Sequence, residues 1–184
     1  MLDISGFHQK YGAGNISDLY YPLSYQNKFL QNLIKKFKYE PFVKELAKTL
    51  SDLIIEHFQL LDQQPNFNDF ILIPAPLAKK RLKWRGYNQS EEIGKHLAEF
   101  FKIPLISDVL LKTKTTSPQI DLAKEKREEN IKGAFLVNPS TRLRARKILL
   151  VDDVYTTGAT MEECARILQE AGAKEIIGIV VARD

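Results

Sequence analysis

The chain has 184 residues, of which 44% are hydrophobic and 27% are charged, and this balance predicts one globular domain over 1–184 with a sizeable core. Its formal net charge of +4 fits an anionic ligand or nucleic acid equally well, and it also fits ordinary solubility. The single cysteine, Cys164, excludes an internal disulfide and a cysteine-rich metal site. Because no apolar run approaches roughly 18 to 20 residues and the start shows no secretory pattern, we expect a cytoplasmic protein without a membrane span.

The first third of the chain predicts two helices after an irregular start. Up to about Tyr25 no periodicity is sustained, so this segment is expected to be extended or irregular. From Lys28 apolar residues recur at helical spacing until Pro41 interrupts them. A second apolar stripe from Val43 to Phe58 predicts a second helix. The lysines of the first helix form a solvated face or, as the minor alternative, a nucleic-acid surface: Lys35, Lys36 and Lys38.

A buried strand over 70–73 is followed by a strongly basic stretch. The strand ends at Pro74-Ala75-Pro76, which cannot continue a central ladder. We interpret Lys79 to Arg85 as a loop, because so many cations repel one another unless an anion neutralises them. The alternative is an exposed basic loop without a ligand. A helix follows, with apolar residues from Ile93 to Phe101.

Residues 109–111 predict another strand, and Gly133 to Val137 is expected to resume the sheet. Between them lies a long polar span, Lys112 to Glu129, which is typical of a functional lid or of a disordered excursion. Three alternate arginines before the next strand are most simply solvated, with nucleic acid as the minor alternative: Arg142, Arg144 and Arg146.

The most informative stretch runs from Lys147 to Thr160. Lys147 to Val151 is an apolar run of the kind buried on both faces of a parallel sheet, and Asp152-Asp153 follow at its carboxyl end. Two acids there suit the vicinal hydroxyls of a sugar if the chain already turns at that point. The five residues of the turn suit a phosphate, because small residues let backbone N–H groups approach an anion, hydroxyls add donors and the helix that follows offers its N-terminus: Thr156, Thr157, Gly158, Ala159 and Thr160.

The alternative for this stretch is a solvated loop with two surface acids and a threonine cap, but the ordered combination is rare. Neither a P-loop nor a dinucleotide-binding glycine pattern occurs in the chain. The helix that follows carries apolar residues from Met161 to Ala171 and stops at Gly172, and 176–182 predicts a further continuous strand. Strand, helix and strand then form a parallel crossover, which predicts an α/β fold with a central parallel sheet.

The stretch from Lys147 to Thr160 resembles the 5-phosphoribosyl diphosphate (PRPP) signature of the type I phosphoribosyltransferases. A longer set of motifs over about Asp18 to Arg183 resembles the ComF-like competence proteins: Ile73-Pro74-Ala75-Pro76-Leu77, Arg81, Arg85-Gly86-Tyr87-Asn88-Gln89, Gln119, Arg127, Asn130 with Gly133-Ala134-Phe135, and the PRPP signature. This resemblance implies the type I fold, with flanking helices and a small hood, and an association with DNA uptake and natural transformation.

The resemblance also implies roles for particular residues. Asp152 and Asp153 would hold the ribose hydroxyls, the loop from Thr156 to Thr160 the 5-phosphate, and Arg81 and Arg85, with Ala75, the diphosphate. Gln119 and Arg127 would belong to a lid and, with Arg85, act in catalysis. Mg²⁺ would arrive with PRPP, and no metal ligand from the protein is expected directly. The reaction would release pyrophosphate as the ribose passes to an acceptor that the sequence does not name.

This chain departs from its expected relatives in two respects. Family members commonly begin with a four-cysteine zinc-ribbon module, which the chain lacks, and purine-salvage relatives place an acid where it has Thr156. A rival function is therefore a non-catalytic PRPP sensor whose basic surface binds single-stranded DNA or a protein of the competence machinery. A homodimer is compatible with either function.

Overall fold

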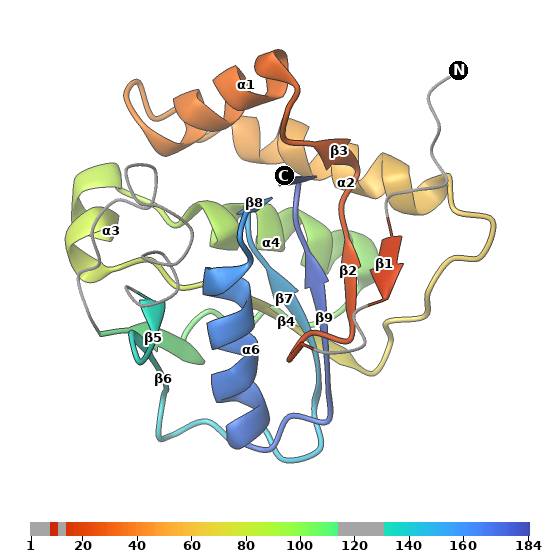
Figure 1. The fold of residues 1–184 in the computed structure, drawn as a ribbon, viewed down its shortest axis with the longest axis vertical. Helices are drawn as coiled ribbons and strands as arrows, with labels where there is room; N and C mark the ends of the chain where they lie inside the picture. The colour runs from red at the N-terminus through yellow and green to blue at the C-terminus, as the bar shows by residue number, and fades with distance from the viewer. Residues whose placement is uncertain (1–7, 11–13, 114–130) are drawn as a thin grey trace.

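The structure, a computed structural model, describes residues 8–10, 14–113 and 131–184. A five-stranded sheet lies at its centre, in the order β1-β2-β9-β7-β4 (Figure 1). These strands are β1 (His8–Lys10), β2 (Asp18–Tyr20), β9 (Glu175–Ile179), β7 (Lys147–Val151) and β4 (Phe70–Pro74). All neighbours are parallel except β1, which is antiparallel to β2 at the edge. The predicted parallel sheet is thus confirmed.

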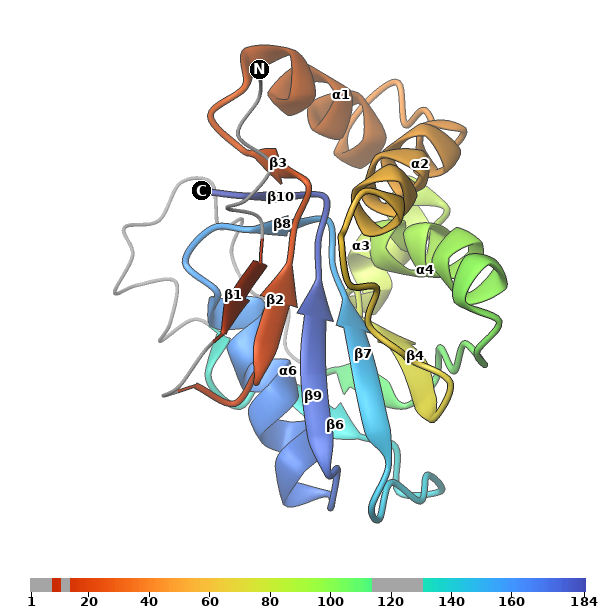
Figure 2. The ribbon, with the colours of Figure 1, turned by 90° about the vertical axis from the view of Figure 1, so that its right-hand side faces the viewer.

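Helices cover both faces of this sheet (Figure 2). On one face lies α6 (Ala159–Glu170), and on the other lie α2 (Leu46–Gln59) and α4 (Gln89–Phe101). The side chains of β7 alternate between the two layers. Ile148 and Leu150 join the core cluster under α6, whereas Leu149 and Val151 join the cluster that includes α2 and α4. Burial on both faces explains why β7 is a continuous apolar run.

A smaller layer lies above the carboxyl ends of the central strands. It contains α1 (Lys28–Lys38) and a parallel three-stranded sheet in the order β3-β10-β8 (Figure 1). The three strands are β3 (Leu23–Ser24), β10 (Ala182–Arg183) and β8 (Val154–Tyr155). We call α1 and this sheet the hood. The prediction of a continuous strand over 176–182 is wrong, because the chain passes from the central sheet into the hood, where Val181 N–H donates to the Asp153 carbonyl.

Two further sequence predictions are wrong. The basic stretch is a helix, α3 (Lys79–Arg85), rather than a loop; its residues are good helix formers, and it ends at Gly86, whose φ of 85° suits glycine. The strand β6 (Phe135–Val137) does not resume the central sheet but pairs with β5 (Leu110–Lys112). It finds no place beside β4, because the backbone of 104–106 bonds to Leu72 along that edge.

The remaining element predictions agree with the structure. The helices expected after Lys28, around Leu50, after Gln89 and after Met161 are α1, α2, α4 and α6. The described residues before Tyr25, 8–10 and 14–24, are short strands and irregular segments, which agrees with the expectation, but the sequence did not indicate that β2 enters the central sheet beside β9. Within the described part of the chain, no helix has both the length and the apolar character needed to cross a membrane.

Candidate functional site

The connection from β7 to α6 forms a small hollow at the carboxyl end of the sheet. Gly158 precedes α6 with a φ of 79°, and a Cβ there would lie 2.2 Å from the Tyr155 hydroxyl, so the turn requires glycine. The sequence reasoning therefore placed the loop correctly, between a buried strand and a helix N-terminus. The hollow is lined by Asp152 and Val154 to Met161, which include all five predicted phosphate-loop residues.

Asp152 lies at the rim of this hollow and is partly buried. Its Oδ1 accepts hydrogen bonds from the Ser90 hydroxyl at 2.8 Å and from the Asp153 N–H at 2.9 Å. Burial and the neighbouring Asp153 carboxylate raise the pKa of Asp152 to about 6, although Lys38 and these hydrogen bonds oppose the shift. Asp152 is therefore a carboxyl group that can change its charge near neutral pH.

Asp153 is more deeply buried, with 3% of its surface exposed. Its Oδ1 lies 2.8 Å from Lys38 Nζ of α1, and its Oδ2 accepts a hydrogen bond from Gln89 Nε2 at 3.4 Å. Burial lowers the pKa of Lys38, but the charges of Asp153 and Asp152 outweigh burial and the net shift is upward. The two adjacent acids thus have different surroundings.

Arg85 ends α3 and is only 7% exposed. Its Nε and Nη1 are buried and have no hydrogen-bond partner among the described residues. Burial lowers the pKa of the guanidinium, which the nearby Asp153 carboxylate opposes, and the guanidinium carbon lies 5.9 Å from the centre of the Tyr39 ring. Because unpaired buried donors are costly, this arrangement suits an anion that would occupy them.

The other predicted site residues are distributed around this centre. Ala75 lies beside the end of β7, but its N–H already donates to the Val151 carbonyl and its carbonyl accepts from Asn88. Arg81, on α3, lies near enough to Arg85 and Lys112 for its charge to lower the pKa of each. Gln119 and Arg127, and the expected lid beyond Thr113, lie outside the described residues.

The sequence reasoning missed three polar contacts of the acid pair and one nearby cation. Gln89 belongs to the motif that begins at Arg85 but was given no role, and Ser90 directly follows it, so only their place in the sequence pointed weakly to the site. Lys38 gave none, because a lysine in the last turn of a helix is ordinary. The nearby cation is Lys112, the last residue of β5. Burial and, to a smaller extent, the charge of Arg81 lower the pKa of Lys112, whereas the Asp152 carboxylate raises it. Among the described residues, no group of three or more His, Cys, Asp or Glu could hold a metal ion.

Comparisons with known proteins identify the family. A family profile described as "Phosphoribosyl transferase domain" matches residues 88–184. The chain is 36% identical over 106 residues to "Competence protein F" of Haemophilus influenzae, covering 57% of this chain and 46% of that protein. It is 34% identical over 103 residues to "Competence protein ComFC" of Bacillus subtilis, covering 56% of this chain and 40% of that protein. The chain thus spans about half the length of the curated relatives it matches.

Among solved structures, the glutamine PRPP amidotransferase from B. subtilis, complexed with ADP and GMP, aligns with a TM-score of 0.45 and 19% identity, covering 74% of this chain and 25% of that chain. The two competence proteins confirm the resemblance to ComF-like proteins. The family match, together with the parallel sheet and its flanking helices, confirms the predicted type I phosphoribosyltransferase fold. The profile covers just over half of the 184 residues, and the chain belongs to the phosphoribosyl transferase domain family.

Proposed function

We propose that this chain binds PRPP with Mg²⁺ at the carboxyl end of β7 and transfers its phosphoribosyl group to an acceptor, releasing pyrophosphate. The observation that carries the proposal is Arg85, a buried guanidinium with two unused donors next to the Asp152-Asp153 pair. Arg85 requires an anion beside it, the two acids offer hydrogen-bond acceptors, and the glycine turn at the N-terminus of α6 suits a second anion. A sugar with a phosphate on one side and a diphosphate on the other meets these three requirements.

In this proposal the protein acts mainly by position and charge. The acids orient the ribose, the loop from Thr156 to Thr160 holds the 5-phosphate, and Arg81 and Arg85 face the diphosphate. The bond from the anomeric carbon to the diphosphate oxygen breaks as the acceptor's electron pair forms the new bond, and the leaving group carries the electrons away. Mg²⁺, when bound with PRPP, would neutralise part of the diphosphate charge. Arg85 would stabilise the negative charge that grows on the leaving group.

Gln119 and Arg127 remain proposed lid residues with a role in catalysis. A role in DNA uptake is likewise a proposal, and the names of the two competence proteins support it. The second candidate function is a non-catalytic PRPP sensor that binds single-stranded DNA or a competence protein. It is favoured by the exposed lysines of the basic helices: Lys28, Lys35 and Lys36 on α1, and Lys79, Lys80 and Lys83 on α3.

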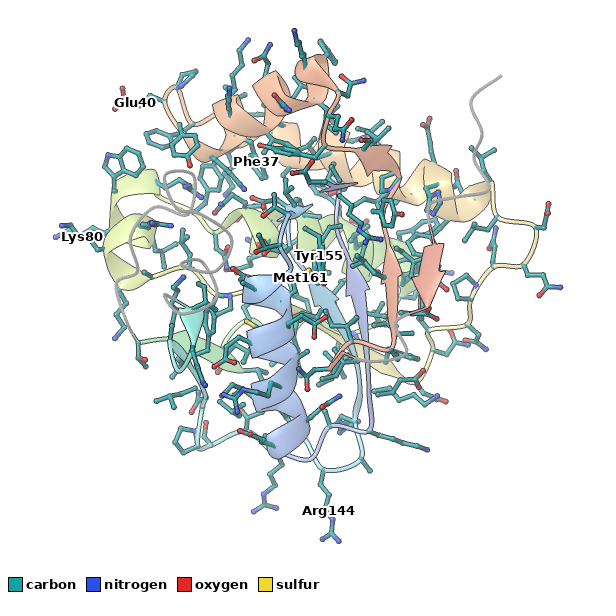
Figure 3. The ribbon with its side chains drawn as sticks, in the orientation of Figure 1. Phe37, Glu40, Lys80, Arg144, Tyr155 and Met161 are labelled. Carbon is teal, nitrogen blue, oxygen red and sulfur yellow. The ribbon has the colours of Figure 1, made fainter. Side chains whose placement is uncertain are left out.

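Calorimetry of PRPP with Mg²⁺, followed by a pyrophosphate-release assay with candidate acceptors, tests the proposal. Replacing Asp152 and Asp153 together by Asn removes the charged acceptors and should weaken PRPP binding strongly. Arg85→Lys keeps the charge but loses the fork geometry, and should reduce turnover by about 10²- to 10³-fold. Arg144→Lys is the matched control, because Arg144 points into solvent at the opposite end of the molecule from Phe37 (Figure 3).

The outcomes separate the two candidates. Unchanged PRPP affinity in the Asn variant, or equal and negligible effects of the two Arg→Lys variants, would contradict the proposed site. PRPP binding without pyrophosphate release, together with single-strand binding that falls steeply with salt, would instead support the sensor.

A further inference from the structure

The last turn of α1 is fastened to the site by two consecutive residues. Lys38 makes the ion pair with Asp153, with only 23% of the lysine side chain and 5% of the aspartate side chain exposed. Phe37 accepts a hydrogen bond at its carbonyl from the Tyr87 hydroxyl, and its ring stacks on Tyr87 with 5.5 Å between ring centres. Figure 3 shows Phe37 between α1 and Tyr155. The hood is therefore joined directly to the segments that carry Arg85 and Asp153.

The two acids follow the last residue of β7, Val151, and their side chains have different surroundings. Leu150 faces α6 and Val151 faces the α2 and α4 layer. Asp152 then lines the hollow at the start of α6, whereas Asp153 does not line it and points to α1.

Both acids accept a hydrogen bond from α4, Asp152 from Ser90 and Asp153 from Gln89, but of the two only Asp153 makes an ion pair with Lys38. Both oxygens of Asp153 are engaged, one by Lys38 and the other by Gln89. Asp152 uses only Oδ1, in hydrogen bonds from the Ser90 hydroxyl and the Asp153 N–H, and its Oδ2 has no hydrogen-bond partner among the described residues. A sugar hydroxyl in the hollow can therefore reach the Oδ2 of Asp152, whereas Asp153 is 3% exposed and both of its oxygens already have a partner.

We propose that Lys38 is a positioning residue of the PRPP site, which acts through Asp153 to hold the last turn of α1 over the carboxyl end of β7, and that Asp152 is the acid that contacts the ribose. This inference rests on the proposed function and deepens it. Asp153 then serves as the anchor for the hood through its ion pair with Lys38. The role requires a cation at residue 38, so arginine can replace lysine while an apolar side chain cannot.

The test is a double-mutant cycle on Lys38 and Asp153 in the full chain. The variants are Lys38→Met, Asp153→Asn and the double variant, with Lys38→Arg as the conservative replacement and Lys36→Met as the control on an exposed position of the same helix. Each variant is measured by PRPP–Mg²⁺ calorimetry and by thermal unfolding. Lys38→Met leaves a buried carboxylate without its cation and should lower the unfolding temperature. The double variant removes both charges and should regain part of that loss.

For PRPP binding we expect Lys38→Met and Asp153→Asn each to weaken affinity by about tenfold, and the double variant to be no weaker than either, because the two residues act as one unit. Lys38→Arg should stay within about threefold of the wild type and Lys36→Met should equal it. Asp152→Asn should cost more than Asp153→Asn. The positioning role is overturned if the affinity losses of Lys38→Met and Asp153→Asn multiply in the double variant, or if Lys38→Met binds PRPP as tightly as Lys36→Met.

Failure of the proposed function would be seen separately. A wild-type chain that folds but does not bind PRPP refutes the function itself, whereas wild-type binding that Lys38→Met leaves intact refutes only the role of Lys38. The unfolding cycle measures the Lys38–Asp153 pair in either case. If Lys38→Met does not fold, the double variant and Lys38→Arg still decide: loss of PRPP binding in Lys38→Arg to the level of the double variant overturns the requirement for a cation.

Discussion

Replacing Arg85 by Met should stabilise the ligand-free protein. Arg85 is 7% exposed, and its Nε and Nη1 have no partner among the described residues. Each buried unsatisfied donor costs about 1–3 kcal/mol, so removing both relieves about 2–6 kcal/mol. The change also removes the attraction to Asp153 and the contact with the Tyr39 ring, for which about 1–3 kcal/mol is a reasonable allowance. At the midpoints of these two ranges the net gain is about 2 kcal/mol, which corresponds to a rise in Tm of about 4–8 °C at this chain length.

The same substitution should have the opposite effect on ligand binding. If the two donors bind the diphosphate, each charge-assisted hydrogen bond contributes about 1.5–3 kcal/mol, so Arg85→Met should weaken PRPP affinity by about 10²- to 10⁴-fold. Thermal unfolding and calorimetry on one preparation measure both effects, with Arg144→Met as the control that should change neither. A lower Tm combined with unchanged PRPP affinity would refute the reasoning, because Arg85 would then be a structural cation.

Three further predictions concern the hollow and the sheet beside it. Because the pKa of Asp152 is about 6, calorimetry should show that Asp152→Asn weakens PRPP binding at about pH 7.5 but makes little difference at about pH 5. The raised pKa also means that the charged form of Asp152 lowers the stability of the folded protein above about pH 6, and this cost disappears as the pH falls. Gly158→Ala should cost about 1–3 kcal/mol in urea unfolding and impair PRPP binding, because φ is 79° and the Cβ would meet the Tyr155 hydroxyl. Gly178→Ala would place a Cβ 2.7 Å from Leu19 Cδ1 and should lower the free energy of unfolding by a similar amount, about 1–3 kcal/mol, but leave PRPP affinity unchanged. A loss of PRPP affinity in Gly178→Ala would mean that strain in the sheet, rather than the turn, controls the site.

The sequence predicted the parts of the fold that depend on nearby residues. The apolar run of β7, the glycine turn and the amphipathic α6 follow one another within a short stretch, so periodicity and turn chemistry were enough. The same holds for α1, α2 and α4. The position of the loop at 156–160 was predicted for this reason, since a loop between a parallel strand and a helix opens at the carboxyl edge of the sheet, whereas its binding of a phosphate stays a prediction.

Predictions failed where a distant partner decides the structure. The strand β2 is only three residues long, and its place in the sheet depends on pairing with β9 at the other end of the chain. The chain leaves the central sheet after β9 because the Val181 N–H donates to the Asp153 carbonyl, a contact that no local sequence pattern indicates. The basic stretch of α3 was misjudged for another reason: charge repulsion was weighted above helix propensity, although the cations point in several directions around a helix.

The acid pair shows how such a distant contact changes a functional interpretation. In the sequence Asp152 and Asp153 are equivalent, because both follow the strand and both could accept hydrogen bonds from a sugar. The structure makes them inequivalent, because Asp152 lines the hollow at the start of α6 whereas Asp153 is buried against Lys38 of α1. In our proposal Lys38, a residue outside the motif, therefore decides which acid contacts the ribose. It follows that single Asn substitutions should separate the two acids: Asp152→Asn should act mainly on PRPP binding, whereas Asp153→Asn should also loosen α1, which hydrogen exchange of the α1 amides would detect. Equal exchange of α1 in both variants would restore the symmetrical interpretation.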